Sequence, residues 1–128
     1  NRIAFGANTF QSGVNCAVQL LKPENRPTAI FASNDEMAIG VMVTAQKMGI
    51  SIPRDLTIVG FDDTPQASKV WPELTTVNLQ VKEMGKLATQ KLLALCSNNI
   101  ELAKKINSEL VPTLVRRDTT APPLILRG

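Results

Sequence analysis

The sequence predicts an α/β protein in which helices cover both faces of a mostly parallel, doubly wound β-sheet, giving three layers. Two observations predict this class. Short β-prone runs alternate along the chain with longer segments of helical periodicity, a spacing typical of parallel sheets. The 128 residues are 44% hydrophobic and 20% charged, an ordinary composition for one globular domain with a sizeable core.

The stretch 28–49 organises the rest of the chain, because it is typical of a buried strand that runs directly into a capped helix. The apolar run Ala29–Ala32 is too short for a helix, and the polar cluster 33–36 after it suits a helix N-terminus. Gly49 supplies the stop. The N-cap could be Ser33, Asn34 or Asp35, and we expect Asn34 to be the one left free to meet a ligand.

The helix expected at 35–48 has two apolar stripes, whereas a helix packed only on a sheet needs one. Two explanations are open: deep burial in a larger protein, or one face on its own sheet and the other in a subunit interface. The first stripe consists of Met37, Val41, Ala45 and Met48, and the second of Ile39, Val43 and the Met42 side.

The remaining elements follow from periodicity and from breakers such as Pro and Gly. Strands are expected at 2–7, 56–61, 74–78 and, interrupted by Pro112, 109–117. Helices are expected at 12–21, with apolar positions Val14, Ala17, Val18 and Leu21; at 66–70, as a short helix after Pro65; and at 82–96, with a core stripe of Met84, Leu87, Ala88, Leu92 and Leu95. Segment 101–108 is predicted to be a polar connection and 118–128 a Pro-rich tail.

Charge and composition argue against several classes of protein. Net charge is only +3, and the 14 Lys and Arg residues are dispersed, without the basic patch of a nucleic-acid-binding surface. No apolar run approaches the length of a membrane span, and Asn1 is an unusual native start, so we expect a fragment of a longer protein. Cys16 and Cys96 lack metal-like spacing and are expected to be buried free thiols in a reducing cytoplasm, with a disulfide as the alternative.

Polar side chains follow the predicted strands where ligands meet a parallel sheet, at its carboxyl edge. They are Asn8 after the first strand, Asn34 after the second, Asp62 after the third, and Leu79 with Gln80 after the fourth. These ends offer amides and a carboxylate but no cation. Such groups suit a polyhydroxylated or amide-bearing small molecule better than a phosphate.

The same residues offer little for catalysis. Histidine is absent, which removes the commonest general base and metal ligand. Asp62 and Asp63 invite comparison with aspartyl-nucleophile phosphatases, but adjacent side chains point apart instead of converging on a metal. A strand-end turn with one helix cap is the structural alternative for both. No phosphate loop and no nucleophile paired with a base is present, so we expect no enzyme activity, catalytic residue, metal or cofactor.

Five motifs in this sequence resemble the effector-binding core of the lactose/galactose repressor (LacI/GalR) family, in family order and over nearly the whole chain. They are RPTAIFASNDEMAIG (26–40), GISIPRDLTIVGFDD (49–63), PELTTV (72–77), EMG (83–85) and LVRRDTTAP (114–122).

The resemblance implies a cytoplasmic bacterial regulator whose core resembles periplasmic sugar-binding proteins. Its helix-turn-helix would precede these residues, and the regulator would bind its operator as a dimer. Residues 1–79 and 112–123 would form the C-terminal lobe, and 80–111 would be elements that cross to the other lobe.

The resemblance also implies roles for particular residues. Effector contacts, most often to a sugar, would come from Asn34 and Asp62. Asn8 stands where an effector-stacking aromatic is frequent, with Phe10 as a candidate substitute, and Leu79 with Gln80 replaces the usual Gln before Pro or Asp. The homodimer interface would contain Ile39, Met42, Val43, Gln46, Gln66, Val70 and Trp71.

Two other functions stay open: a transport-type sugar-binding protein of the same fold, and an enzyme of the doubly wound class. An upstream helix-turn-helix would identify a regulator, an upstream signal peptide would identify a transport protein, and turnover of a substrate would identify an enzyme.

Overall fold

The structure, a computed structural model, describes residues 2–22, 26–106 and 109–122. The chain divides into two compact units. Residues Asn78–Thr113 form unit 2, and the residues on either side of them form unit 1. Within the described residues, none of the helices combines the length and the apolar character needed to cross a bilayer.

The sheet of unit 1 is built around a parallel pair, β1 (Ala29–Phe31) and β2 (Thr57–Val59), in which Ile30 lies opposite Ile58. Helix α2 connects the two strands, as parallel pairing requires. β1 is predicted correctly as a strand but is not buried as expected. Its Ile30 packs against the core, whereas Phe31 is 63% exposed, because successive side chains of a strand point to opposite faces.

The third strand, β3 (Thr76–Asn78), continues the sheet beside β2. Val59 and Thr75 form a parallel bridge, the Gly60 N–H donates to Thr75 O, and the Asp62 N–H donates to Val77 O over 2.9 Å. β3 is in turn bonded to β4 (Thr113–Val115). The predicted strands at 56–61, 74–78 and 109–117 are therefore confirmed, with shorter bounds.

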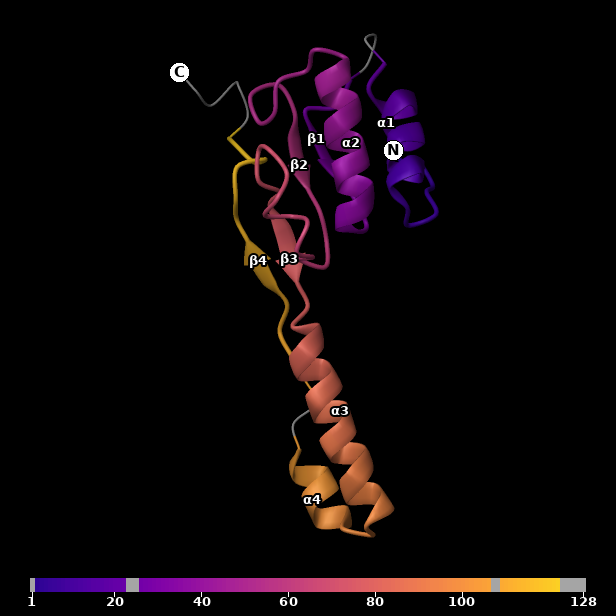
Figure 1. Cartoon of the computed structure of the whole chain (residues 1–128), viewed down its shortest axis with the longest axis vertical. Helices are drawn as coiled ribbons and strands as arrows, with labels where there is room; N and C mark the ends of the chain where they lie inside the picture. Colours follow the sequence, from indigo (N-terminus) through magenta and orange to yellow (C-terminus); the bar gives the residue numbers. More distant parts are fainter. Residues whose placement is uncertain (1, 23–25, 107–108, 123–128) are drawn as a thin grey trace. The chain divides into compact units, whose positions relative to one another are not determined.

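Two helices of unit 1 pack on each other, α1 (Phe10–Leu20) and α2 (Asp35–Lys47), and α2 lies against β2 (Figure 1). α1 begins two residues earlier than predicted, because Thr9 and Ser12 form a capping box. The axes approach closely at Gly13 and Gly40: a Cβ on Gly13 would lie 2.3 Å from a backbone oxygen of α2.

This packing explains much of the apolar character of α2 inside one chain. Met37, Val41 and Ala45 are buried in the core that α2 shares with β2 and α1, whereas Ile39 and Val43 are only partly buried. Helix burial on two sides therefore does not by itself require a subunit interface. The largest fully buried apolar side chains of this core are Leu21, Leu56, Ile58 and Leu74.

Gly49 ends α2 as predicted. Its φ of +72° is the left-handed conformation that glycine adopts without strain, and the next N–H, of Ile50, returns to Ala45 O over 2.9 Å. Ile50 is consequently buried, while Met48, predicted as part of the apolar stripe, is exposed beyond the helix end.

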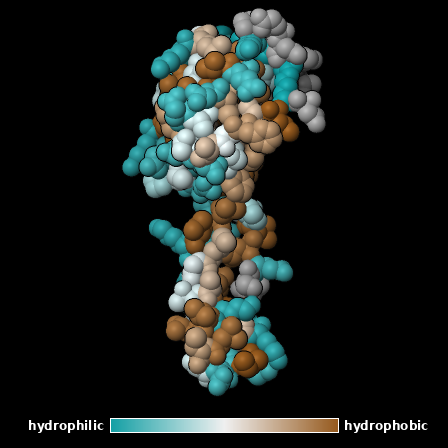
Figure 2. Space-filling view, turned by 90° about the vertical axis from the view of Figure 1, so that its right-hand side faces the viewer, coloured by the Kyte–Doolittle hydropathy of each residue, from teal (hydrophilic) through white to brown (hydrophobic). Residues whose placement is uncertain are grey.

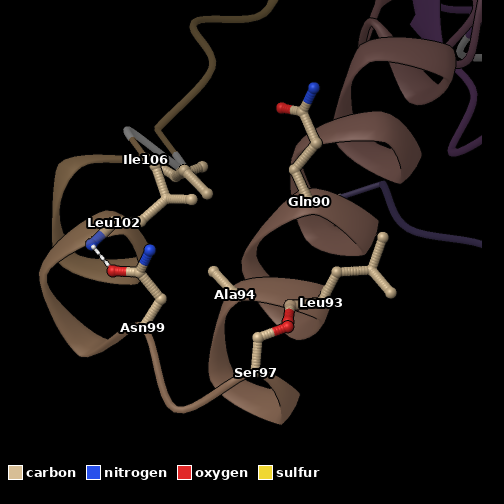
Figure 3. Close-up of a pocket in the computed structure, with 7 residues that line it drawn as sticks. All are labelled: Gln90, Leu93, Ala94, Ser97, Asn99, Leu102 and Ile106. Atoms are coloured by element: carbon tan, nitrogen blue, oxygen red, sulfur yellow. Dashed lines mark hydrogen bonds between the residues drawn. The ribbon is translucent and has the colours of Figure 1, made fainter.

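Unit 2 consists mainly of α3 (Val81–Cys96) and α4 (Ile100–Lys105), and Figure 2 shows many hydrophobic side chains on the surface of this unit. Figure 3 shows a pocket that residues of both helices line, among them Ala94 and Leu102. The predicted helix at 82–96 is confirmed, but its predicted core stripe is not buried. Ala94 of α3 and Ala103 of α4 are the buried residues here, because only one short helix covers α3 in the described unit. Cys96 is exposed, contrary to the prediction, whereas Cys16 is buried and both thiols are free.

Four further predictions are wrong. Residues 2–7 form no strand, because a β-prone run becomes a strand only when its backbone finds a neighbouring ladder, and these described residues do not. Segment 66–70 forms hydrogen-bonded turns instead of a helix, with the Ala67 N–H donating to Thr64 O and the Lys69 N–H to Gln66 O. The polar connection at 101–108 contains α4, which Asn99 caps by accepting from the Leu102 N–H. Val18 of α1 is exposed.

The expected Pro-rich tail is partly an ordered piece of unit 1. The Thr119 side chain is fully buried. Its Oγ1 donates to Ile58 O over 2.7 Å and accepts from the Thr75 N–H over 2.9 Å. The Ile58 N–H donates to Thr119 O. Residue 119 thus ties the end of the described chain to β2 and to the start of β3. Residues 123–128 of the expected tail lie outside the described part.

Candidate functional site

Asn34 is the N-cap of α2, which corrects the expectation that it is free of capping. Its Oδ1 accepts from the Met37 N–H over 2.8 Å, and its Nδ2 donates to Asn8 O over 3.1 Å. An extended backbone and a short amide side chain suit this position. The side chain is partly exposed, so Asn34 still presents polar surface at the carboxyl end of β1.

Asp62 follows β2 and lines the same hollow as Asn34. This hollow, of about 330 Å³, is lined by Asn34, Glu36, Ile39, Asp62, Thr64 and Gln66. Among the described residues, the Asp62 carboxylate forms no hydrogen bond and no ion pair, although it is partly buried. Its oxygens can therefore accept hydrogen bonds from a ligand in the hollow.

Burial raises the pKa of the Asp62 carboxyl above its usual range, and the nearby negative charge of Asp35 raises it further. Both causes disfavour the ionised form in the absence of a donor. A group that donated hydrogen bonds to this carboxylate would relieve both.

Asn8 lies beside Asn34, and Phe10 follows two residues later at the start of α1. Asn8 has a φ of +57°, a conformation that asparagine tolerates better than most residues. Its backbone oxygen accepts from Asn34, and its Oδ1 accepts from Ser33 Oγ over 3.4 Å. Phe10 is 38% exposed as the first residue of α1. The structure thus brings Asn8 to Asn34, and Asn34 to Asp62.

Leu79 and Gln80 belong to unit 2. Gln80 has a φ of +54°, its N–H donates to Asn78 Oδ1 over 2.6 Å, and its Nε2 donates to Val111 O over 2.8 Å. Leu79 is partly buried. The side-chain amide of Gln80 is therefore used within its own unit.

Asp35, which the sequence suggested only as a helix cap, binds Thr64, one of the residues that line the hollow. It is fully buried, and its carboxylate accepts from the Thr64 N–H over 2.7 Å, from Thr64 Oγ1 and from Thr76 Oγ1. The first turn of α2 adds the favourable end of the helix dipole. Asp35 thereby connects three elements: α2, the turn that follows β2, and β3. In the sequence, only its place in an acidic capping cluster indicated a role for this residue.

Asp63, next to Asp62, pairs with Arg117. The Nη2–Oδ1 distance is 2.6 Å, and the two side chains are 16% and 15% exposed. Arg117 Nη1 also donates to Leu74 O over 2.8 Å. Asp62 and Asp63 therefore point to different surroundings, and neither caps a helix. The pairing joins positions far apart in sequence, so no local pattern predicts it, and the adjacent arginines at 116–117 were its only indication.

The residues expected at a dimer interface occupy one region of unit 1. Ile39, Val43 and Gln46 share a face of α2, and Gln46 Nε2 donates to Trp71 O over 2.9 Å. Trp71 is 80% exposed. Gln66 is exposed and Val70 partly buried against the core, whereas Met42 is buried in the core and offers no surface to a partner.

The described ranges contain no cluster of three or more His, Cys, Asp or Glu side chains that could hold a metal ion.

Residues 2–120 match the family described as periplasmic binding protein-like domain. The chain belongs to this family. Within it, the chain is 41% identical over 118 residues to the probable HTH-type transcriptional repressor ExuR of Bacillus subtilis, covering 90% of this chain and 35% of that protein. It is 37% identical over 119 residues to the HTH-type transcriptional regulator GalS of Salmonella typhimurium, covering 93% and 34%.

Solved structures agree with these relatives. The Lac repressor dimer bound to operator and an anti-inducer matches with a TM-score of 0.81 at 33% identity, covering 91% of this chain and 40% of that one. A dimeric Lac repressor with a C-terminal deletion matches with a TM-score of 0.83. The predicted α/β class and the predicted relationship to LacI-type regulators are confirmed. This periplasmic binding protein-like chain spans about a third of the length of the curated relatives.

Proposed function

We propose that this chain is the effector-sensing and self-associating part of a LacI-type transcriptional regulator. The observation that carries the proposal is the pair Asn34 and Asp62, which follow neighbouring parallel strands and line one hollow of about 330 Å³. Ligands of open α/β sheets bind at such strand ends. The regulators among its relatives support the rest of the assignment.

The effector is proposed to be a neutral polyhydroxylated molecule such as a sugar. Asp62 offers an unpaired acceptor, Asn34 and Gln66 offer amides, and Glu36 adds a second carboxylate to the hollow. Two carboxylates and no lining cation disfavour an anionic ligand, whereas hydroxyl groups donate to carboxylates and exchange bonds with amides. Asn8 and Phe10 are proposed to extend this polar edge. Leu79 and Gln80 are also proposed to contact the effector.

A transport-type sugar-binding protein of the same fold is the alternative, and it is not favoured, because the relatives are named as transcriptional repressors and regulators. We propose that the chain acts in the cytoplasm and binds its effector without turnover. The operator-reading part is proposed to lie outside these 128 residues.

The proposed lobe boundaries are those of the sequence: 1–79 and 112–123 in the C-terminal lobe, and 80–111 in elements that cross to the other lobe. The division of the structure into two units with Asn78–Thr113 as the second supports this arrangement.

A homodimer is proposed on the face of α2 that carries Ile39, Val43 and Gln46, with Gln66, Val70 and Trp71 beside it. An exposed Trp next to partly buried aliphatic side chains is typical of an interface anchor. Because a two-fold interface uses the same patch on both subunits, one substitution removes two contacts.

Thermal-shift measurements on the full-length protein test the ligand class. The probes are D-galactose, D-glucose, D-ribose and D-xylose, with D-galacturonate as an anionic comparison. A bound sugar at 100 times its Kd would stabilise the native state by about 2.7 kcal/mol and raise Tm.

Asp62→Asn should weaken binding of the responding sugar by about 1–3 kcal/mol, because ligand hydroxyls lose a charged acceptor. Asp118→Asn, at an exposed carboxylate, is the matched control and should change affinity little. A Tm that no neutral sugar raises, or an affinity unchanged by Asp62→Asn, would overturn the proposal.

A further inference from the structure

The turn that carries Asp62 has a backbone that most residues avoid. Asp62 has a φ of +111° and Asp63 a φ of +53°, two consecutive positive values without a glycine. Such a conformation is unfavourable for a residue other than glycine and persists only where the surroundings determine it. The contacts that hold this turn therefore decide where the Asp62 side chain points.

Backbone contacts hold the two ends of the turn. The Asp62 N–H donates to Val77 O over 2.9 Å, and the Thr64 N–H donates to Asp35 Oδ2 over 2.7 Å. Between these anchors, the Asp63 N–H donates to Thr76 Oγ1 over 3.4 Å.

Arg117 holds the Asp63 side chain. Its Nη2 lies 2.6 Å from Asp63 Oδ1, in the range of a strong charge-assisted hydrogen bond. Arg117 is itself held by Nη1 donating to Leu74 O over 2.8 Å and by its N–H donating to Thr75 Oγ1 over 2.9 Å. The guanidinium is thus held at Leu74 O and the backbone of Arg117 at Thr75, which together make a rigid support for the Asp63 side chain.

We propose that Arg117, acting through Asp63, is a positioning residue for effector binding. By drawing Asp63 to one side of the turn, it keeps the left-handed backbone at 62–63 and leaves the Asp62 carboxylate facing the hollow that Asn34 also lines. This inference rests on the proposed function of Asp62. Arg117 raises effector affinity without touching the effector, because a binding group that is already oriented loses less entropy on association.

A purely structural ion pair would stabilise the fold without affecting the affinity of the folded protein. A double-mutant cycle separates the two roles. The variants are Arg117→Gln, Arg117→Lys and Asp62→Asn, made singly and as Arg117→Gln with Asp62→Asn in the full-length protein. Arg116→Gln is the matched control: it is the adjacent arginine, exposed, and removes the same charge.

Calorimetric titration uses the monosaccharide, among those tested above, that raises Tm most. The titration temperature lies well below the Tm of every variant, and the measured stoichiometry gives the fraction of protein that is folded. Arg117→Gln should weaken binding about 10-fold at unchanged stoichiometry, and Arg116→Gln less than about 2-fold. Arg117→Lys should recover part of the loss, because it keeps the charge but not the fork of donors. In the Asp62→Asn background, Arg117→Gln should cost less than about 3-fold.

Asp63→Asn gives a second measure, because asparagine tolerates the left-handed conformation and still offers an oxygen to Arg117. It should retain more affinity than Asp63→Ala. Crystal structures without sugar should show positive φ at 62 and 63 in Arg116→Gln but not in Arg117→Gln.

The outcomes separate the two proposals. If Asp62→Asn weakens binding and Arg117→Gln does not, or costs the same in both backgrounds, the positioning role is wrong and the effector site stands. If Asp62→Asn has no effect, the proposed function fails, and the sugar-free crystal structures alone then test whether Arg117 holds the turn.

Discussion

Replacing Asp35 by alanine should be among the most damaging single changes in unit 1. The fully buried carboxylate accepts from the Thr64 N–H, Thr64 Oγ1 and Thr76 Oγ1. A hydrogen bond to a charged group contributes about 1.5–3 kcal/mol, and buried donors left without acceptors carry a desolvation penalty. The three bonds share one acceptor group and are not additive, so we expect a loss of about 3–5 kcal/mol.

This loss would be a large part of the roughly 5–15 kcal/mol by which native domains are stable. Asp35→Asn should cost less, because the amide oxygen can still accept from Thr64 and the Thr76 hydroxyl can rotate to accept from the new NH₂. Effector affinity should fall with both variants, since Thr64 lines the hollow.

Glu36→Ala is the control for Asp35→Ala, because Glu36 carries the same charge in the same first turn of α2 but is exposed. It loses only the helix-dipole contribution of about 0.3–1 kcal/mol. Urea unfolding of the full-length protein, followed by circular dichroism, measures both. Equal losses for the two variants would refute the reasoning, since burial of the Asp35 carboxylate would then contribute nothing.

Three further perturbations test other parts of the molecule. Gly13→Ala should lower stability by about 1–3 kcal/mol, because its Cβ meets the backbone of α2, whereas Gly85→Ala, with nothing within 4 Å, should raise helix stability by about 0.5–1 kcal/mol in the same unfolding assay. Asp62→Asn should raise Tm at neutral pH while weakening effector binding, because the raised pKa of Asp62 means that its ionisation favours the unfolded state. The Tm difference between the variant and the wild-type protein should vanish as pH falls below the pKa of Asp62 in the unfolded chain. A Tm difference that grows towards low pH would contradict this sign. Ile39→Asp or Trp71→Ala should shift the full-length protein towards monomer in sedimentation velocity, and an unchanged dimer would remove this face from the interface.

Much of the α/β architecture follows from local sequence. The apolar run before Asn34, the acids of the first turn of α2 and the left-handed Gly49 act within a few residues, so the strand–helix–turn unit is readable without tertiary information. Asn34 and Asp62 could be proposed as neighbours for a similar reason, because parallel pairing brings the carboxyl ends of consecutive strands to one edge.

Tertiary structure decided what those residues are free to do. Local chemistry ranks Ser33, Asn34 and Asp35 alike as caps. Hydrogen bonds from Thr64 and from the buried Thr76 hydroxyl engage Asp35 and leave the cap to Asn34. The β-prone residues 2–7 lack a ladder, and the apolar stripe of α3 lacks a cover, because both depend on neighbours that no local pattern specifies.

The clearest case is the pair of adjacent acids after β2. Side-chain chemistry alone does not distinguish Asp62 from Asp63, since both are acids in the same turn. Arg117, which follows more than fifty positions later, binds Asp63 and leaves Asp62 at the hollow. Which acid is structural and which is open to a ligand is set by a contact across the fold, because the energy of an ion pair depends on distance in space and not on separation along the chain.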